Sequence, residues 1–233
     1  APPEVAQLFW QLNVVRNINS AEQYEELSVF VHVQDPDGIS DIEKIRILHA
    51  QKELLWEYTF DEWQQVERDG ESWFGSNGIQ CSFSQVMPRG EYRVKISDKA
   101  GESVEASFII SRDIIGLQRG PLEKNRFPSM TVTEERLTLQ STGPEVAVSL
   151  YDEDNNFTQS EVLKVGPSQR TQDGSEQTGN AGAHRTVVSD WQSKWGGVHS
   201  IWLHSYSSAE GLGLVSGPYE TSLGGDDPEK NTW

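Results

Sequence analysis

The chain has 233 residues, 35% of them hydrophobic, and carries 36 acidic against 19 basic residues, a formal net charge of −17. This length can bury one large or two medium cores. The negative charge repels phosphate backbones and anionic headgroups, so we expect no nucleic-acid partner. No run of about 18 apolar residues occurs, so the sequence predicts no membrane-spanning segment.

The chain begins at Ala1, and its first residues have neither the basic flank nor the apolar core of a signal peptide. We therefore expect a mature exported protein, periplasmic or on the cell surface, whose removed leader could have carried a lipid anchor; an arbitrary boundary would look the same. Cys81 is the only cysteine, so no intramolecular disulfide can form. This favours a bacterial envelope protein over a disulfide-stapled animal ectodomain.

Alternating apolar residues predict strands along the first half of the chain. An apolar-rich stretch at 5–18 comes first, and the run 27–33 then has Leu or Val at every second position. The Asp-Pro-Asp-Gly at 35–38 predicts a turn, because proline fixes φ while Asp and Gly tolerate turn geometry. Further strands are expected at 42–48 and 54–58.

The apolar period changes at Asp61. Asp61 with Gln64 resembles a capping box, and apolar residues recur at helical spacing, so we expect a short helix or turn up to about Arg68. Residues 92–110 then predict a hairpin, since two alternating runs flank a turn that contains Gly101.

The second half repeats this order more loosely. A similar last hairpin, with its turn at Gly211, is expected about a hundred residues after the first. The other apolar runs, taken as short strands or core segments, are 130–132, 137–140, 146–151 and 188–195.

Three motifs point to a known fold. They are Val-x-Val-x-Asp-Pro-Asp-Gly-Ile at 31–39, Ile-x-Lys-Ile-x-Ile at 42–47 and Gly-Glu-Tyr-x-Val-x-Ile-x-Asp-x-x-Gly at 90–101. This succession resembles a bacterial immunoglobulin-like or fibronectin-type β-sandwich over residues 5–112, and the resemblance implies that Tyr92 is a corner tyrosine. The cysteine pair of antibody-type domains is missing.

The fold class expected is therefore all-β, with two tandem immunoglobulin-like β-sandwich domains. We assign them to 1–112 and, on a weaker resemblance, to 127–222, joined by a connection at 113–126. Within the second domain, 166–185 has almost no apolar side chain and is expected to be a long mobile loop. Residues 223–233 would form a C-terminal tail.

Tryptophans are the first candidate ligand-binding residues. Exposed indoles could stack on sugar rings or on a partner protein, although a sandwich commonly buries one tryptophan. The six considered are Trp56, Trp63, Trp73, Trp191, Trp195 and Trp202.

Acidic turns are the candidate metal sites. Asp152, Asp154 and Asn156 offer oxygens at alternate positions, as at the start of a Ca²⁺ loop, but the later glycine and bidentate carboxylate are missing. A solvated acidic turn is the alternative. A second acidic cluster would form if loops at one end of the first domain brought Asp35 and Asp37 to Asp98.

No constellation in the sequence demands one chemistry, so we expect no catalytic residues and no cofactor, with Ca²⁺ as the one option. The expected function is that of a non-catalytic interaction or structural module of an exported cell-envelope protein, with a protein or polysaccharide ligand. The alternatives are a carbohydrate-binding accessory module that uses tryptophan, and an enzyme with an unrecognised acidic site.

Overall fold

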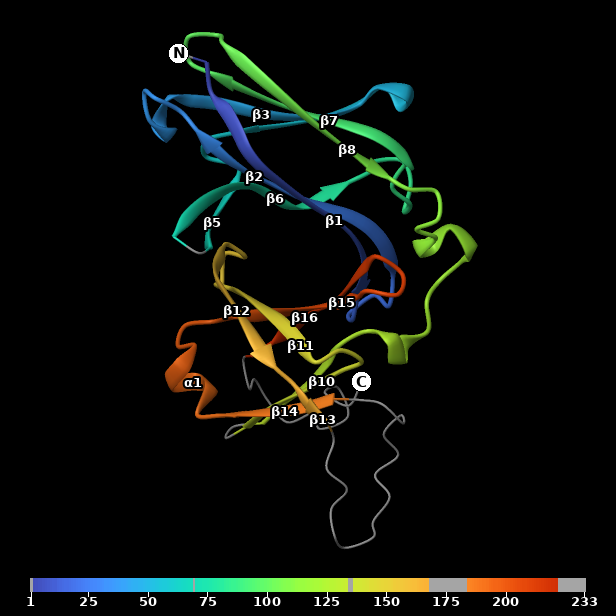
Figure 1. Cartoon of the computed structure of the whole chain (residues 1–233). Helices are drawn as coiled ribbons and strands as arrows, with labels where there is room; N and C mark the ends of the chain where they lie inside the picture. Colours follow the sequence, from blue (N-terminus) through green and yellow to red (C-terminus); the bar gives the residue numbers. More distant parts are fainter. Residues whose placement is uncertain (1, 69, 134–135, 168–183, 222–233) are drawn as a thin grey trace, which may run out of the picture. The chain divides into compact units, whose positions relative to one another are not determined.

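The structure is a computed structural model that describes residues 2–68, 70–133, 136–167 and 184–221 (Figure 1). The described part is all-β and sandwich-like, with several sheets. Its strands are β1 (Glu4–Asn17), β2 (Gln23–Gln34), β3 (Ile42–His49), β4 (Leu54–Thr59), β5 (Gln64–Arg68), β6 (Glu71–Gln80), β7 (Gly90–Asp98), β8 (Ser103–Ile110), β9 (Ser129–Val132), β10 (Arg136–Ser141), β11 (Glu145–Tyr151), β12 (Phe157–Lys164), β13 (Gly166–Pro167), β14 (His184–Ser189), β15 (Ser200–Ser207) and β16 (Leu212–Glu220).

Helical segments are short. They are the 3-10 turns η1 (Ile39–Asp41), η2 (Ala50–Lys52), η3 (Gly116–Arg119) and η4 (Lys124–Arg126), and the single-turn helix α1 (Trp191–Lys194). No helix in the described ranges is long and apolar enough to cross a membrane.

The chain divides into two compact units. The first comprises Ala1–Asn13 and Glu25–Arg119, and the second Val14–Tyr24 and Gly120–Trp233. These bounds differ from those expected from the sequence, because the end of β1 and the start of β2 belong to the second unit. There the Ile18 N–H donates to the Gly217 carbonyl over 2.8 Å.

In the first unit the strand orders are β1-β2-β6-β5 and β4-β3-β7-β8. The predicted hairpin is present, with Gly90 of β7 opposite Ile110 of β8 and Gly101 in the left-handed region at φ 88°. Strands of both sheets contribute buried side chains to the core, because in each strand alternate side chains point to the same face of the sheet. The core includes Val29, Val31, Ile45, Ile47, Tyr92, Val94, Ile96, Phe108 and Ile110.

Tyr92 is wholly buried in this core. Its ring stacks on Phe108 with centroids 5.1 Å apart, and its hydroxyl donates to the Pro88 carbonyl over 2.8 Å. The hydrogen bond satisfies a polar atom that would otherwise be buried alone, and it ties β7 to the chain just before it.

The second unit contains the strand orders β12-β11-β15-β16 and β13-β14-β10-β9. The second predicted hairpin, β15–β16, is present, with Leu203 opposite Ser216. Strands of both orders and α1 supply the core, which includes Met130, Leu137, Leu139, Val146, Val148, Leu150, Trp191, Trp195, Ile201, Leu203 and Tyr219.

Of the short helix or turn expected up to about Arg68, only a short turn is present. Residues 60–62 form a turn, and β5 follows at Gln64–Arg68, paired with β6. The predicted capping pair, Asp61 and Gln64, is replaced by another contact across the turn. The Glu62 carboxylate accepts from the Thr59 N–H over 2.9 Å. Pairing with β6 outweighs the local helical spacing here.

The long polar loop expected at 166–185 falls mostly outside the described residues. Its ends, at 166–167 and 184–185, belong to β13 and β14, which pair with each other. The C-terminal tail at 223–233 also lies outside the described residues.

Candidate metal centre

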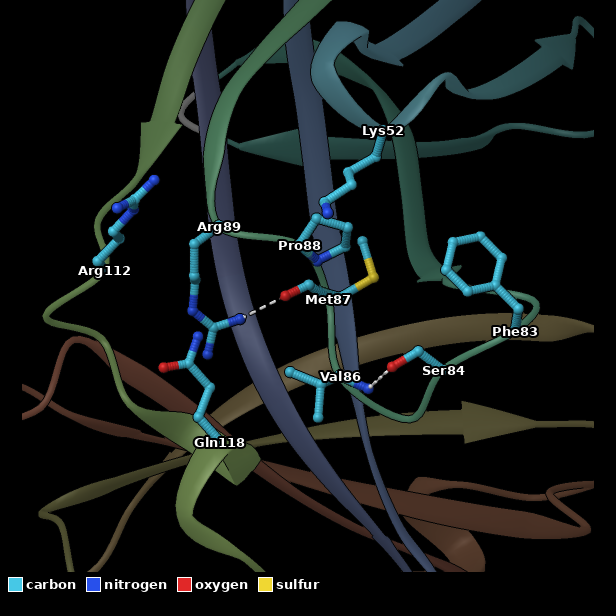
Figure 2. A pocket seen from close by; sticks show the side chains of 9 residues that line it. All are labelled: Lys52, Phe83, Ser84, Val86, Met87, Pro88, Arg89, Arg112 and Gln118. Carbon is cyan, nitrogen blue, oxygen red and sulfur yellow. Dashed lines mark hydrogen bonds between the residues drawn. The ribbon is translucent and has the colours of Figure 1, made fainter.

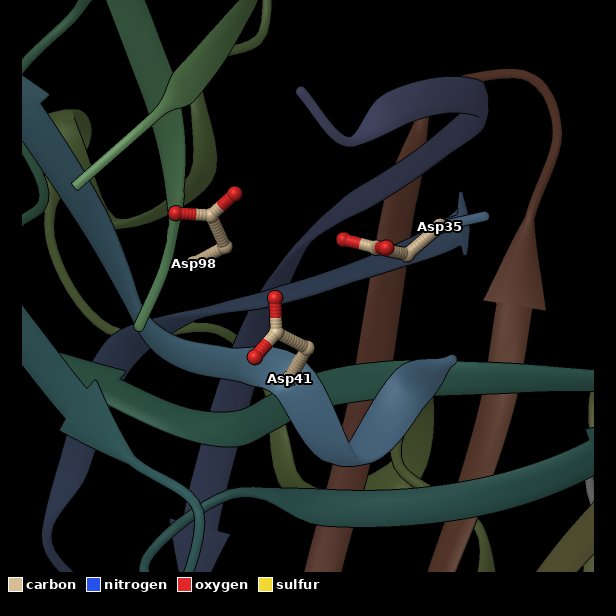
Figure 3. Close-up of side chains that lie close together, drawn as sticks. All are labelled: Asp35, Asp41 and Asp98. Atoms are coloured by element: carbon tan, nitrogen blue, oxygen red, sulfur yellow. The ribbon is translucent and has the colours of Figure 1, made fainter. Parts of the chain in front are cut away.

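Three aspartates of the first unit converge on one point (Figure 3). Asp35 directly follows β2, Asp41 ends η1 and Asp98 ends β7. Each offers a carboxylate oxygen that lies within 4.8 Å of the other two. Among the described residues, no other group of three or more His, Cys, Asp or Glu side chains meets this criterion.

Local sequence explains how the three aspartates meet. The Gly38 N–H donates to the Asp35 carbonyl over 3.0 Å, which closes the predicted turn and needs φ 97° at Gly38. The turn leads into η1, and the Lys99 N–H then donates to the Asp41 carbonyl over 2.9 Å, so that Asp41 is held beside the end of β7.

The cluster is poorly neutralised. Asp98 is only 1% exposed, and one of its oxygens accepts from the Glu102 N–H over 2.8 Å. Oδ2 of Asp35 is buried and has no hydrogen-bond partner. Of the ion pairs found in the described part of the chain, none includes these three aspartates.

The basic residue nearest to Asp98 in the sequence does not neutralise the three aspartates. Lys99 follows Asp98 directly, but its Nζ donates to the Ser40 carbonyl over 2.7 Å. Three carboxylates thus share a small volume, and one of their oxygens is buried without a partner, so a cation between them would offset their mutual repulsion.

The spacing suits a hard cation. Ca²⁺ binds oxygen at about 2.3–2.6 Å, so two oxygens on one ion lie at most about 5 Å apart. The 4.8 Å limit satisfies this condition for all three pairs. Carboxylate oxygens are the preferred ligands, and water can complete the six to eight positions that Ca²⁺ requires.

Sequence reasoning identified two of the three residues. It grouped Asp35 and Asp98 with Asp37, whose place is taken by Asp41. The Asp37 N–H instead donates to Oδ1 of Asp35 over 2.8 Å, and Asp37 is exposed. The signal for Asp41 was its position four residues beyond Asp37, past the turn, but η1 was not expected there.

The other predicted metal site has a different geometry. Oδ1 of Asp152 accepts from the N–H groups of Asp154 and Asn156 over 3.0 and 2.8 Å, and Oδ2 accepts from the Asn156 side chain. These hydrogen bonds, that from the Asn156 N–H above all, lower the pKa of Asp152. The segment fits the solvated acidic turn, because its first carboxylate already caps its own backbone.

Three of the six candidate tryptophans do not fit a surface platform. Trp63, Trp191 and Trp195 are buried, and the indole N–H groups of Trp191 and Trp195 donate to the Thr133 carbonyl and the Glu161 carboxylate. Their apolar rings fill the cores, which corrects the prediction that they bind ligand.

The other three tryptophans are half-buried. Trp56 donates its indole N–H to the Gln80 carbonyl over 2.8 Å, and Trp73 has its ring centroid 5.9 Å from that of His32. Trp202 packs so close to Gly217 that a Cβ there would lie 2.6 Å from its ring. Ligand binding by these three stays a prediction.

The structure also pairs a serine with a histidine that the sequence did not single out. The Ser149 hydroxyl lies 3.2 Å from Nε2 of His204, but Ser149 is only 5% exposed. Burial lowers the pKa of His204 to about 4. A buried hydroxyl cannot reach a substrate, so the pair gives no support to nucleophilic catalysis.

No protein-family model matches the chain, and a search of curated proteins found no similar sequence.

Proposed function

We propose that the chain is a non-catalytic interaction or structural module of an exported bacterial envelope protein, and that its first unit binds one Ca²⁺ ion through Asp35, Asp41 and Asp98. The observation that carries the metal site is the buried, unpartnered Oδ2 of Asp35 beside two further carboxylates. The ion would join the end of β2, η1 and the end of β7.

We assign both units to the immunoglobulin-like sandwich, and the hydrogen bond from the Tyr92 hydroxyl back to Pro88 supports this for the first unit. The envelope location rests on the sequence resemblance and on the lone cysteine, Cys81, which is buried.

Thermal unfolding in the presence of Ca²⁺ tests the metal site. A ligand that binds only the folded state stabilises it by about 2.7 kcal/mol at a hundred times its Kd. We expect millimolar CaCl₂ to raise the Tm of the first unit by several degrees more than NaCl of equal ionic strength, which only screens the net negative charge.

Asp41→Asn is the discriminating variant. Asp41 is half-buried, and the substitution keeps the size of the side chain while removing one of three repelling charges. Without Ca²⁺ the variant should melt above the parent protein, and with Ca²⁺ it should show only the NaCl effect. An equal Ca²⁺ response in parent and variant would refute the site.

Asp154→Ala is the matched control in the second unit. It removes an exposed carboxylate from the other acidic turn, where we expect no bound ion. The Ca²⁺ response should therefore be unchanged. Loss of the response in this variant alone would place the ion in the turn at Asp152 instead.

A further inference from the structure

A pocket of about 420 Å³ opens on the first unit (Figure 2). Its volume is in the range of ligand-binding pockets, about 300–1,000 Å³. Most of its lining comes from the segment between β6 and β7. The residues that line it are Lys52, Phe83, Ser84, Val86, Met87, Pro88, Arg89, Arg112 and Gln118.

The charge of this pocket is opposite to that of the protein. The chain has 36 acidic and 19 basic residues, yet the lining contains three basic residues and no acidic one. Lys52 and Arg112 are both exposed, and no ion pair with an acidic side chain is found for either within the described residues.

Arg89 is not available to a ligand. Its guanidinium is bidentate to the Glu25 carboxylate, with N–O distances of 2.7 and 2.9 Å, and both side chains are at least 96% buried. It also donates to the carbonyls of Met87, Ile114 and Ile115. Arg89 therefore forms a fixed wall, and the uncompensated charge of the pocket belongs to Lys52 and Arg112.

The pocket also has an apolar part. Met87 is buried, Val86 and Pro88 are half-buried, and the Phe83 ring is 69% exposed beside them. In Figure 2 the Lys52 side chain reaches toward Pro88, Arg112 lies beyond Arg89, and Phe83 lies at the opposite end of the lining from Arg112. The apolar part thus has one exposed cation, Lys52, beside it, and a second, Arg112, lies beyond Arg89.

We propose that this pocket binds an acidic peptide segment of a partner protein, with carboxylates at Lys52 and Arg112 and an apolar side chain against Phe83, Val86 and Pro88. Charge complementarity selects a carboxylate-bearing ligand, and the apolar part selects one with a hydrophobic side chain. The exposed rim favours a peptide over a small metabolite, because a peptide continues across the surface and buries area beyond the pocket.

The probe is a set of blocked tetrapeptides with Glu at both ends and Leu, Phe or Val in the middle. The control set replaces both Glu by Lys. Binding is followed by amide chemical shifts of the full chain in the presence of EDTA, so that the outcome does not depend on the proposed Ca²⁺ site. We expect at least one Glu peptide to shift the amides of Phe83, Ser84 and Met87, and the Lys peptides to leave them unmoved.

Reversing the charges of Lys52 and Arg112 tests whether these two residues bind the peptide. Lys52→Glu combined with Arg112→Glu should weaken the Glu peptide at least tenfold, and both side chains are exposed, so folding is unaffected. Arg93→Glu is the matched control, because Arg93 is an exposed cation of β7 that does not line the pocket. The Kd of Arg93→Glu for the Glu peptide should stay within twofold of that of the parent protein.

Several outcomes would overturn the proposal. They are equal binding of Lys and Glu peptides, unchanged affinity in the double variant, and an absence of shifts at the lining residues with millimolar concentrations of every Glu peptide. Equal shifts from acetate at the same carboxylate concentration would also refute it, because the site would then bind small anions and not a peptide.

Discussion

The Glu25–Arg89 ion pair is the residue-scale feature with the largest expected effect on stability. Besides Arg89, the Glu25 carboxylate accepts from the N–H groups of Met87 and Leu117 over 2.9 and 2.8 Å. Gly116 must be glycine here, because its φ is 53° and a Cβ would lie 2.1 Å from Oε1 of Glu25. The pair thereby fixes the segment that follows β8.

We predict that Arg89→Met destabilises the first unit by about 3–5 kcal/mol, because it leaves a buried carboxylate without its counter-ion. Glu25→Leu combined with Arg89→Met should recover part of this loss, since no charge then stays buried. Urea unfolding followed by hydrogen exchange of β7 amides measures both. A single variant no less stable than the double variant would contradict this account.

Glu26 predicts a pH dependence. Glu26 is 8% exposed, and burial raises the pKa of its carboxyl group to about 8, while a hydrogen bond with Gln80 acts in the opposite direction. The folded state binds this proton more tightly than the unfolded state does. The stability from Glu26 is therefore full below pH 4.5 and is lost as the pH rises to about 8.

Glu26→Gln should remove this dependence. At pH 5 the variant and the parent should be similar in stability, and at pH 9 the variant should be more stable by up to roughly 4–5 kcal/mol. Urea midpoints at the two pH values measure the difference. His204 titrates equally in both proteins, so its contribution cancels from the difference in stability. A difference that stays constant across the pH range would show that Glu26 ionises normally in the folded state.

At the scale of elements, β2 and β6 approach closely at one glycine. A Cβ on Gly75 would lie 1.9 Å from the Val29 carbonyl oxygen and 2.8 Å from the Phe30 Cα, and both atoms are backbone of β2 that cannot move aside alone. Gly75→Ala should therefore separate the strands and destabilise the first unit by at least about 2 kcal/mol.

Gly78 in the same strand is the control for this prediction. A Cβ there meets no atom within 4 Å, so Gly78→Ala should change the urea midpoint little. Equal effects of the two substitutions would mean that β2 and β6 do not pair as described.

Elements with strong alternation could be predicted from the sequence. The two hairpins β7–β8 and β15–β16 have a buried face and a glycine turn, and both are confirmed. β12 was missed, because it lies at a sheet edge with most side chains exposed and so lacks the alternation. At β5, pairing with a distant strand overrode a helical local pattern.

Contacts between distant residues could not be predicted. Glu25 and Arg89 are 64 residues apart, and no sequence pattern links them. Two of the three clustered aspartates could be predicted, because Asp35 and Asp98 each lie at the end of a predicted strand. Asp41 joined them through a short 3-10 turn that the sequence did not indicate.

At the scale of the whole molecule, the net charge of −17 sets the background for every electrostatic claim. Added salt should stabilise the protein by screening, whichever cation is used. A specific site must therefore appear as a saturable difference between cations at equal ionic strength. We expect one such site, at Asp35, Asp41 and Asp98.

Calorimetric titration of the full chain with CaCl₂, at a constant ionic strength set by NaCl, counts the ions that bind at such a site. We predict saturable binding of one Ca²⁺ per chain, abolished by Asp41→Asn and unchanged by Asp154→Ala. The absence of saturable binding to the parent protein, or the same binding in Asp41→Asn, would mean that the three aspartates hold no Ca²⁺.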